Sequence, residues 1–306
     1  MPTTKLIFGC GYLGARVARR WLAAGDRVLA VTRSAERAAD LRQQGIAPIV
    51  ADVTDANTLV ALAELPPLDT VLYAIGFDRR LENSRQQVYV EGLRNVLGRL
   101  PADATRLVYI STTGVYGQHD GAWVNEESPC EPSREGGQVA LAAEQLLLAH
   151  SLGERSIRLR LAGLYGPGRV PRRAELAAGQ PVAAPRHGYL NLIHVDDAVA
   201  VILAAEALAV PPPRLYLVSD GQPVLRAEYF AEVARLTGGP PPRFIEPPAD
   251  SPAAERNDGD KRIDSSRLRS ELKIELKYPS YRAGLAAIIA AESQRASGAT
   301  GSASAQ

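Results

Sequence analysis

The chain has 306 residues, 46% of them hydrophobic, and a formal net charge of +1; it can form a large core but lacks the basic surplus with which proteins bind nucleic acids or anionic membranes. Its two cysteines predict neither a disulfide framework nor a metal site, and no apolar run is long enough to span a bilayer. The first apolar run begins too close to the amino terminus for a signal peptide, so we expect a cytoplasmic globular protein whose ligand is a small molecule.

Apolar runs of strand length alternate with helical patterns through the first two thirds of the chain. The expected strands are 6–8, 27–31, 47–50, 70–74, 106–111 and 156–161. The expected helices between them are 13–24, 35–45, 57–65, 86–100 and 141–152. Such alternation is typical of a parallel sheet with helices on both faces. We therefore predict an α/β fold with a doubly wound parallel sheet.

A glycine motif marks the first strand–helix junction. In "LIFGCGYLGARVARR", Gly9, Gly11 and Gly14 form G-x-G-x-x-G directly after a strand and at the head of a helix. The first glycine permits a tight turn, the second admits a pyrophosphate and the third allows close packing, while the helix start offers free N–H groups. The motif predicts dinucleotide binding here, with Tyr12 and Leu13 in the same loop. Glycines kept only for packing are the alternative.

The end of the second strand selects the dinucleotide. NAD-binding proteins place a carboxylate there for the ribose 2′-hydroxyl. This strand instead ends in Thr32, Arg33 and Ser34. A guanidinium suits a 2′-phosphate, and the two hydroxyls can donate further hydrogen bonds. We predict NADP(H) as the preferred cofactor and NAD(H) as the second choice; a solvated Arg33 is the alternative.

The ends of the third and fourth strands add to the predicted cofactor site. Asp52 and Val53 follow the third strand and are expected to meet the adenine edge, although a turn or helix-cap role for Asp52 explains it equally well. Ala74, Ile75 and Gly76 end the fourth strand with small residues, where a ribose and pyrophosphate would pass.

Three further motifs carry a family resemblance. "ISTTGVYG" (110–117), "RLAGLYGPG" (160–168) and "NLIHVDDAVAVILAA" (191–205) resemble the landmarks of the extended short-chain dehydrogenases/reductases, the NAD-dependent epimerase/dehydratase superfamily. The resemblance runs from residue 5 to about residue 290. It implies bound NAD(P), a homodimer and two lobes. We assign 1–167 and 189–220 to an NAD(P)-binding Rossmann domain, 168–188 and 221–292 to a smaller α/β substrate lobe, and 293–306 to a disordered tail.

The catalytic residues of that family are only partly present. Its members usually catalyse with a Ser or Thr and a Tyr-x-x-x-Lys pair, in which the lysine lowers the pKa of the tyrosine. The resemblance assigns the hydroxyl to Thr112. Anchored on Glu144, it puts Gly136 in the place of the tyrosine and Ala140 in that of the lysine, and Tyr89 in the place of a usual asparagine. The chain therefore resembles atypical members that keep the cofactor loop and lack the pair.

Other polar residues offer no clear replacement for the tyrosine. Tyr116 and Tyr165 are expected to line the cleft or pack, His119 stands in a loop, and His194 joins the lobes. Asp196 and Asp197 resemble a helix N-cap pair. Arginines near the substrate side are either ligands for a phosphate or carboxylate or simply solvated: Arg134, Arg169, Arg172 and Arg173. The charged segment 254–262 is a candidate flap.

Three functional hypotheses follow. The first is an NADP(H)-dependent oxidoreductase or epimerase with a reorganised acid site. The second is a non-catalytic NADP(H)-binding regulatory or sensor protein. The third is a scaffold that has lost nucleotide binding.

Overall fold

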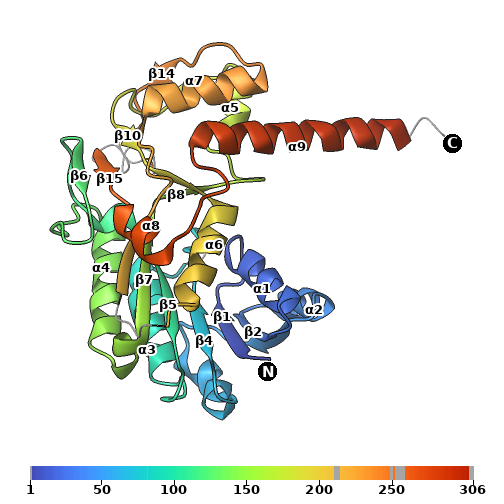
Figure 1. Ribbon diagram of the computed structural model, residues 1–306, viewed down its shortest axis with the longest axis vertical. Helices are drawn as coiled ribbons and strands as arrows, with labels where there is room; N and C mark the ends of the chain where they lie inside the picture. The colour runs from blue at the N-terminus through green and yellow to red at the C-terminus, as the bar shows by residue number, and fades with distance from the viewer. Residues whose placement is uncertain (1, 81, 210–213, 249–250, 252–258, 303–306) are drawn as a thin grey trace.

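A seven-stranded parallel sheet forms the centre of the molecule (Figure 1). The computed structural model describes residues 2–80, 82–209, 214–248, 251 and 259–302. The strand order is β3-β2-β1-β4-β5-β7-β12, and all neighbouring pairs are parallel. The strands are β1 (Thr4–Phe8), β2 (Arg27–Thr32), β3 (Ala47–Val50), β4 (Thr70–Tyr73), β5 (Leu107–Thr112), β7 (Ser156–Leu161) and β12 (Arg214–Val218). This confirms the predicted fold, whose strand order reverses between β1 and β4.

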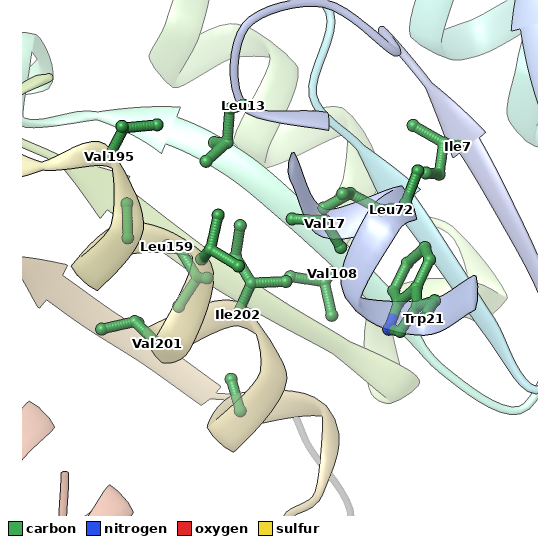
Figure 2. Close-up of a cluster of buried hydrophobic side chains, with 14 of the residues drawn as sticks. Ile7, Leu13, Val17, Trp21, Leu72, Val108, Leu159, Val195, Val201 and Ile202 are labelled. Carbon is green, nitrogen blue, oxygen red and sulfur yellow. The ribbon is translucent and has the colours of Figure 1, made fainter. Parts of the chain in front are cut away.

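Two apolar layers cover the opposite faces of the sheet. One layer contains α1 (Gly14–Ala23), α2 (Ala35–Gln43) and α6 (Val195–Glu206); the other contains η1 (Ala56–Glu64), η2 (Gln87–Glu91), α3 (Gly92–Leu97) and α4 (Glu135–Leu148). Successive residues of β1 alternate between the layers, with Ile7 in the first and Leu6 and Phe8 in the second. Figure 2 shows Val17 of α1 and Ile202 of α6 in the first layer.

Three predicted helices differ from the observed ones. Segment 57–65 is the 3-10 helix η1, and segment 86–100 begins with the π-helical turn η2 before α3. Helix α4 begins at Glu135 rather than at Leu141. The two glycines near its start therefore belong to the helix. Gly137 is needed there because a Cβ atom would overlap the carbonyl oxygen of Gly114, so close packing offsets the low helix propensity of glycine.

The smaller lobe is built on short strand pairs and has its own core. The remaining strands are β6 (Ala122–Val124), β8 (Gly163–Tyr165), β9 (Val182–Ala183), β10 (Tyr189–Leu190), β11 (Leu192–His194), β13 (Val224–Leu225), β14 (Phe244–Ile245) and β15 (Lys261–Ile263). The pairs are β6 with β15, β8 with β11, β9 with β14 and β10 with β13. The remaining helices are η3 (Thr113–Val115), η4 (Ser151–Arg155), α5 (Arg173–Ala177), α7 (Arg226–Thr237), α8 (Ser266–Leu272) and α9 (Tyr281–Ser302). Leu176, Tyr229 and Leu285 join α5, α7 and α9 in one apolar cluster, while the predicted domain boundaries stay a prediction.

The carboxyl-terminal segment differs from the predicted disordered tail of 293–306. Helix α9 continues to Ser302 and extends away from the rest of the molecule (Figure 1), and 303–306 lie outside the described residues. Within the described residues, no helix combines the length and the apolar character needed to cross a membrane.

Candidate functional site

The glycine loop lies at the carboxyl end of β1, beside the end of β4. Gly9 has a φ of +88°, and a Cβ atom there would overlap the carbonyl group of Ala74. A Cβ atom on Gly14 would overlap the carbonyl oxygen of Gly9. Gly11 has no atom within 4 Å of the place where its Cβ would stand. The first and third glycines therefore serve the fold, whereas the second leaves open space beside the backbone, as pyrophosphate binding requires.

A cleft of about 740 Å³ opens over this loop, within the size range of cofactor sites. Its walls include all but two of the predicted cofactor-binding residues: Gly9, Gly11, Tyr12, Leu13, Thr32, Arg33, Asp52, Val53, Ala74, Ile75 and Gly76. Gly14 instead packs behind the loop, and the Ser34 hydroxyl caps α2 by accepting a hydrogen bond from the Arg37 N–H at 3.2 Å. We name this the nucleotide cleft.

The charged side chains of the nucleotide cleft lie in two places. Arg33 and Arg37 line it at the end of β2, and the Arg37 guanidinium donates a hydrogen bond to the Cys10 carbonyl oxygen at 3.2 Å. Sequence reasoning missed Arg37, whose only signal was its place in the first turn of the next helix. Elsewhere on the wall, Arg80 pairs with Asp78 and holds the pKa of that carboxyl at about 2.

Asp52 has the turn role that the sequence left open. Its Oδ1 accepts hydrogen bonds from the Thr54 N–H and hydroxyl, at 2.9 and 2.8 Å. The residue still lines the cleft. The turn explains the residue type at this position without a ligand.

Tyr12 and Arg169 connect the nucleotide cleft to a second cavity. The Tyr12 hydroxyl donates to the Pro167 carbonyl oxygen at 3.1 Å, and the Arg169 guanidinium lies 5.5 Å from the centre of the Tyr12 ring. Arg169, Leu161 and Leu164 line both spaces. The second cavity, which we name the substrate cavity, has a volume of about 510 Å³ and lies between the end of the sheet and the smaller lobe.

The substrate cavity contains the predicted Thr112 and several cations. The Thr112 Oγ1 accepts a hydrogen bond from the Gly114 N–H at 3.0 Å, which leaves its own proton free to be donated. The cationic residues of the wall are Arg134, Arg169, Arg172, Arg226 and Lys261. Arg226 was missed in the sequence because it stands in no motif, and Lys261 was noted only as part of a flap. Arg173 does not line the cavity and pairs with Glu292.

Gly136 and Ala140 both lie in α4 but have different neighbours. The nearest side chain to a Cβ on Gly136 is that of Arg85, with its Nε 3.9 Å away. Arg85 pairs with Glu135. Ala140 packs against the buried cluster around η3. The Tyr89 hydroxyl accepts a hydrogen bond from the Phe77 N–H at 2.9 Å.

The other candidate acids have structural partners. Tyr116 is buried, and its hydroxyl accepts a hydrogen bond from Arg160 at 2.7 Å. The His194 Nδ1 caps α6 by accepting a hydrogen bond from the Asp196 N–H, and burial lowers the pKa of His194 to about 4. The predicted cap pair is thus wrong: Asp197 instead accepts hydrogen bonds from the N–H groups of Lys277 and Tyr278, at 2.7 and 3.0 Å.

Two further candidates also offer no acid. Tyr165 is fully buried in the core of the smaller lobe. His119 is exposed in its loop and makes one 3.4 Å contact with the Gly117 carbonyl oxygen. Neither side chain lines the nucleotide cleft or the substrate cavity. Within the described residues, no group of three or more His, Cys, Asp and Glu side chains is placed to hold a metal ion.

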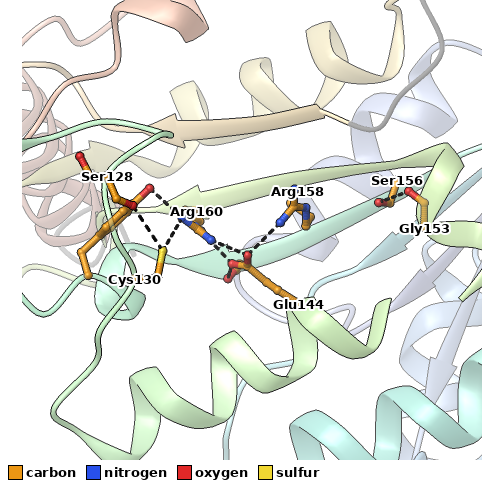
Figure 3. Close-up of polar contacts among 9 residues, drawn as sticks. Ser128, Cys130, Glu144, Gly153, Ser156, Arg158 and Arg160 are labelled. Carbon is orange, nitrogen blue, oxygen red and sulfur yellow. Dashed lines mark hydrogen bonds and ion pairs between the residues drawn. The ribbon is translucent and has the colours of Figure 1, made fainter. Parts of the chain in front are cut away.

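A buried ionic network holds α4 against strands β5 and β7 (Figure 3). The Glu144 carboxylate of α4 accepts hydrogen bonds from Arg160 at 2.7 and 2.9 Å and from Arg158 at 3.2 Å, both on β7. It also accepts one from the Ser111 hydroxyl on β5. Because Ser111 precedes Thr112, the network positions the threonine relative to α4.

Comparison with known proteins identifies the family. Residues 6–218 match the NAD-dependent epimerase/dehydratase family. Protein YeeZ of Escherichia coli K12 is 30% identical over 287 residues, which cover 89% of this chain and 95% of YeeZ. The dTDP-6-deoxy-L-talose 4-dehydrogenase (NAD(P)+) of Kitasatospora kifunensis is 29% identical, covering 79% of this chain and 80% of that protein.

A solved structure supports the fold. The Bordetella bronchiseptica enzyme WbmG, in complex with NAD and UDP, superposes with a TM-score of 0.79 at 22% identity, covering 95% of this chain and 94% of WbmG. The superposition includes nearly all of both chains, so WbmG and this protein share the overall fold. The family match spans more than half of the chain, and with the YeeZ similarity it leads to one conclusion: the protein belongs to the NAD-dependent epimerase/dehydratase family, among the extended short-chain dehydrogenases/reductases.

Proposed function

We propose that the protein binds NADP(H) in the nucleotide cleft and acts as an NADP(H)-dependent oxidoreductase or epimerase on a small molecule in the substrate cavity. The observation that carries the cofactor preference is the pair of guanidinium groups, Arg33 and Arg37, that line the cleft where β2 ends without a carboxylate. Guanidinium groups suit a 2′-phosphate, whereas NAD-specific sites use an acidic residue there. When bound, the nicotinamide supplies hydride-transfer chemistry.

The residues of this chain have separate roles in the proposal. The open space at Gly11 and the free N–H groups at the start of α1 receive the pyrophosphate. The Thr112 hydroxyl donates a hydrogen bond to the reacting oxygen of the substrate, because it accepts from the Gly114 N–H and its own proton is free. Gly136 and Ala140 replace the tyrosine and lysine of the family, so the acid site is altered.

Fluorescence titration with NADPH and NADH tests the cofactor preference. We expect NADPH to bind more tightly than NADH by about tenfold or more, and Arg33→Ala to remove most of that difference. Arg42→Ala is the matched control, since Arg42 is exposed in the last turn of α2, the helix that follows Arg33, and does not line the cleft. Tighter binding of NADH than of NADPH by the unmodified protein contradicts the proposal.

A non-catalytic NADP(H)-binding regulatory protein is the second candidate. It is favoured by the surroundings of Gly136, where Arg85 and Glu135 form an ion pair instead of an acid site. Turnover of NADPH with any member of a panel of sugars, ketones and hydroxysteroid-like compounds excludes this candidate. A partner protein whose capture from cell extract changes between NADP and NADPH supports it.

We also propose that the protein works in the cytoplasm as a homodimer, without a nucleic-acid or membrane partner. The net charge of +1 supports the absence of a nucleic-acid or membrane partner. The family resemblance supports the homodimer. Light scattering coupled to size-exclusion chromatography tests the dimer.

A further inference from the structure

Three cations from separate parts of the chain meet in the substrate cavity. Arg134 precedes α4, Arg226 begins α7 and Lys261 begins β15, and all three line the cavity. Arg134 and Lys261 lie against the same backbone position, because a Cβ on Gly259 would overlap the Arg134 guanidinium and lie 3.7 Å from the Lys261 Nζ. No aspartate or glutamate of the described residues lines this cavity.

Two of these cations are buried and form no direct ion pair with a carboxylate of the described residues. Arg226 is 7% exposed and Lys261 is 8% exposed. The Arg226 Nε has no hydrogen-bond partner among the described residues, and the Lys261 Nζ donates to a neutral carbonyl oxygen, that of Tyr116, at 2.6 Å. The Asp260 carboxylate lies near Arg226, and its charge opposes the effect of burial on the pKa of that arginine. Its Oδ1 also accepts a hydrogen bond from the Tyr189 N–H at 2.8 Å.

The energetic cost of this arrangement points to a ligand. Burial, with a smaller contribution from the nearby Arg134 charge, lowers the pKa of Lys261 to about 8. Burial also lowers the pKa of Arg226. Buried cations without a partner destabilise a protein unless an anion neutralises them. We propose that Arg134, Arg226 and Lys261 bind one anionic group, a carboxylate or a phosphate, of a substrate whose remaining part is mainly apolar.

The rest of the wall explains the apolar part of that substrate. It is formed mostly by carbon atoms: Leu161, Leu164, Pro171, Ala183, Pro185, Leu190, Leu192 and Phe230. Asn191 provides the one side-chain amide of the described wall, and both of its ends are already used: Nδ2 donates to the Lys261 carbonyl oxygen and Oδ1 accepts from the Ile263 N–H, each at 2.8 Å. Besides the cations, the polar side chains of the wall are the hydroxyl residues Thr112, Thr113, Tyr189 and Tyr229. The proposal rests on the proposed function only in naming the ligand as the substrate.

Calorimetric titration of the full chain without nucleotide tests this assignment. The probes are 3-phenylpropanoate, phenyl phosphate, the neutral 3-phenylpropanamide, inorganic phosphate and UDP-glucose. We expect at least one aromatic anion to bind about tenfold or more tightly than the neutral amide and than UDP-glucose. The two aromatic anions distinguish a carboxylate from a phosphate. Inorganic phosphate is expected to bind more weakly than phenyl phosphate, because it buries no apolar surface.

Variants connect the binding to the three cations. Lys261→Met and Arg226→Gln are expected to reduce the affinity for the aromatic anion about tenfold or more, with unchanged circular dichroism and NADPH affinity. Arg267→Gln, on an exposed arginine of α8 that does not line the cavity, is expected to bind as the unmodified protein does. Equal affinity for the neutral amide, tighter binding of UDP-glucose, no binding of any anion, or full affinity in both folded variants overturns the proposal. Because no nucleotide is present, these outcomes are separate from a failure of NADPH to bind.

Discussion

Gly136 and Gly137 are adjacent residues with different structural requirements. A Cβ on Gly137 would overlap the Gly114 carbonyl oxygen and lie 2.7 Å from the Pro132 Cβ. A Cβ on Gly136 would meet only the Arg85 side chain, at 3.9 Å. Gly136 is the residue that the family resemblance aligns with the tyrosine. Gly137 is the residue that the packing of α4 against the loop after β5 requires. The two positions therefore respond differently to the same substitution.

We predict that Gly137→Ala destabilises the protein by about 1–3 kcal/mol, because α4 must move away from the loop after β5. Gly136→Ala is expected to be neutral or to stabilise by up to about 1 kcal/mol, since alanine is the better helix former. Urea unfolding of both variants measures the difference. Equal stability of the two variants contradicts this account of the glycines.

A buried carboxyl gives the protein a pH-dependent stability. Asp220 is 2% exposed, and burial raises its pKa to about 7, aided by the Asp197 charge and opposed by its hydrogen bond from the Gln222 N–H and by Arg269. The folded protein thus binds a proton that the unfolded chain releases near pH 4. This contribution to stability is complete below pH 4 and is lost as the pH rises through 7.

Asp220→Asn removes that dependence while it keeps the Oδ1 that accepts the Gln222 N–H. We expect the variant to be more stable than the unmodified protein by up to about 4 kcal/mol at pH 8 and to be similar to it near pH 4. Chemical unfolding at pH 4, 6 and 8 measures this. If the difference in stability between the variant and the unmodified protein does not grow from pH 4 to pH 8, the raised pKa of Asp220 is not the cause of the pH dependence.

At the scale of elements, α4 depends on one carboxylate. Glu144 is 1% exposed and accepts hydrogen bonds from two arginines and one serine. We predict that Glu144→Gln destabilises the protein by about 3–5 kcal/mol, because it leaves Arg158 and Arg160 buried without a counter-charge. Glu135→Gln, on the same helix, is the control: its ion pair with Arg85 is more exposed, so the expected loss is below about 1 kcal/mol.

Thermal unfolding with circular dichroism compares these two variants. If both variants lose a similar amount of stability, the buried network contributes no more to the stability of the protein than the more exposed Glu135–Arg85 pair does. A larger loss in Glu144→Gln, together with weaker substrate-dependent turnover, agrees with a role for the network in positioning the end of β5.

The elements could be predicted where their patterns are local. Strand β7 has the predicted bounds because it is an inner parallel strand whose buried residues form a short, mainly apolar run. Strand β3 also has the predicted bounds, although it is an edge strand with no buried residue. The start of α4 was not predictable, because two glycines suppress the helical signal and the contact that requires Gly137 comes from Gly114, far back in the chain. Helix η2 was also missed, since its π-helical turn has no period that distinguishes it from an α-helix.

At the scale of the whole molecule, the two cavities differ in how far the sequence defines them. The residues predicted for the nucleotide cleft gather there because the motif lies in one segment and parallel strands end at one edge. The substrate cavity draws its cations from residues 134, 226 and 261, which only the folded chain brings together. Single-sequence patterns carry no information on such distant pairs.

We predict that NADPH at about a hundred times its dissociation constant stabilises the protein by about 2.7 kcal/mol. Gly11→Ala is expected to leave the stability without nucleotide within about 0.5 kcal/mol, because its Cβ meets no atom, and to abolish the NADPH effect, because that Cβ enters the path of the pyrophosphate. Thermal shift with and without NADPH measures both. An unchanged NADPH effect in this variant means that the nucleotide does not approach the loop at this glycine.

Arg169 belongs to the walls of both cavities and lies over the Tyr12 ring. A ligand that repositions this guanidinium in one cavity reshapes the other, so the two occupants do not associate independently. Thermodynamic linkage then requires a single coupling constant: the factor by which one ligand alters the affinity of the second equals the factor in the reverse direction. Paired titrations in either order yield the same ratio, and truncation of Arg169 brings that ratio to unity.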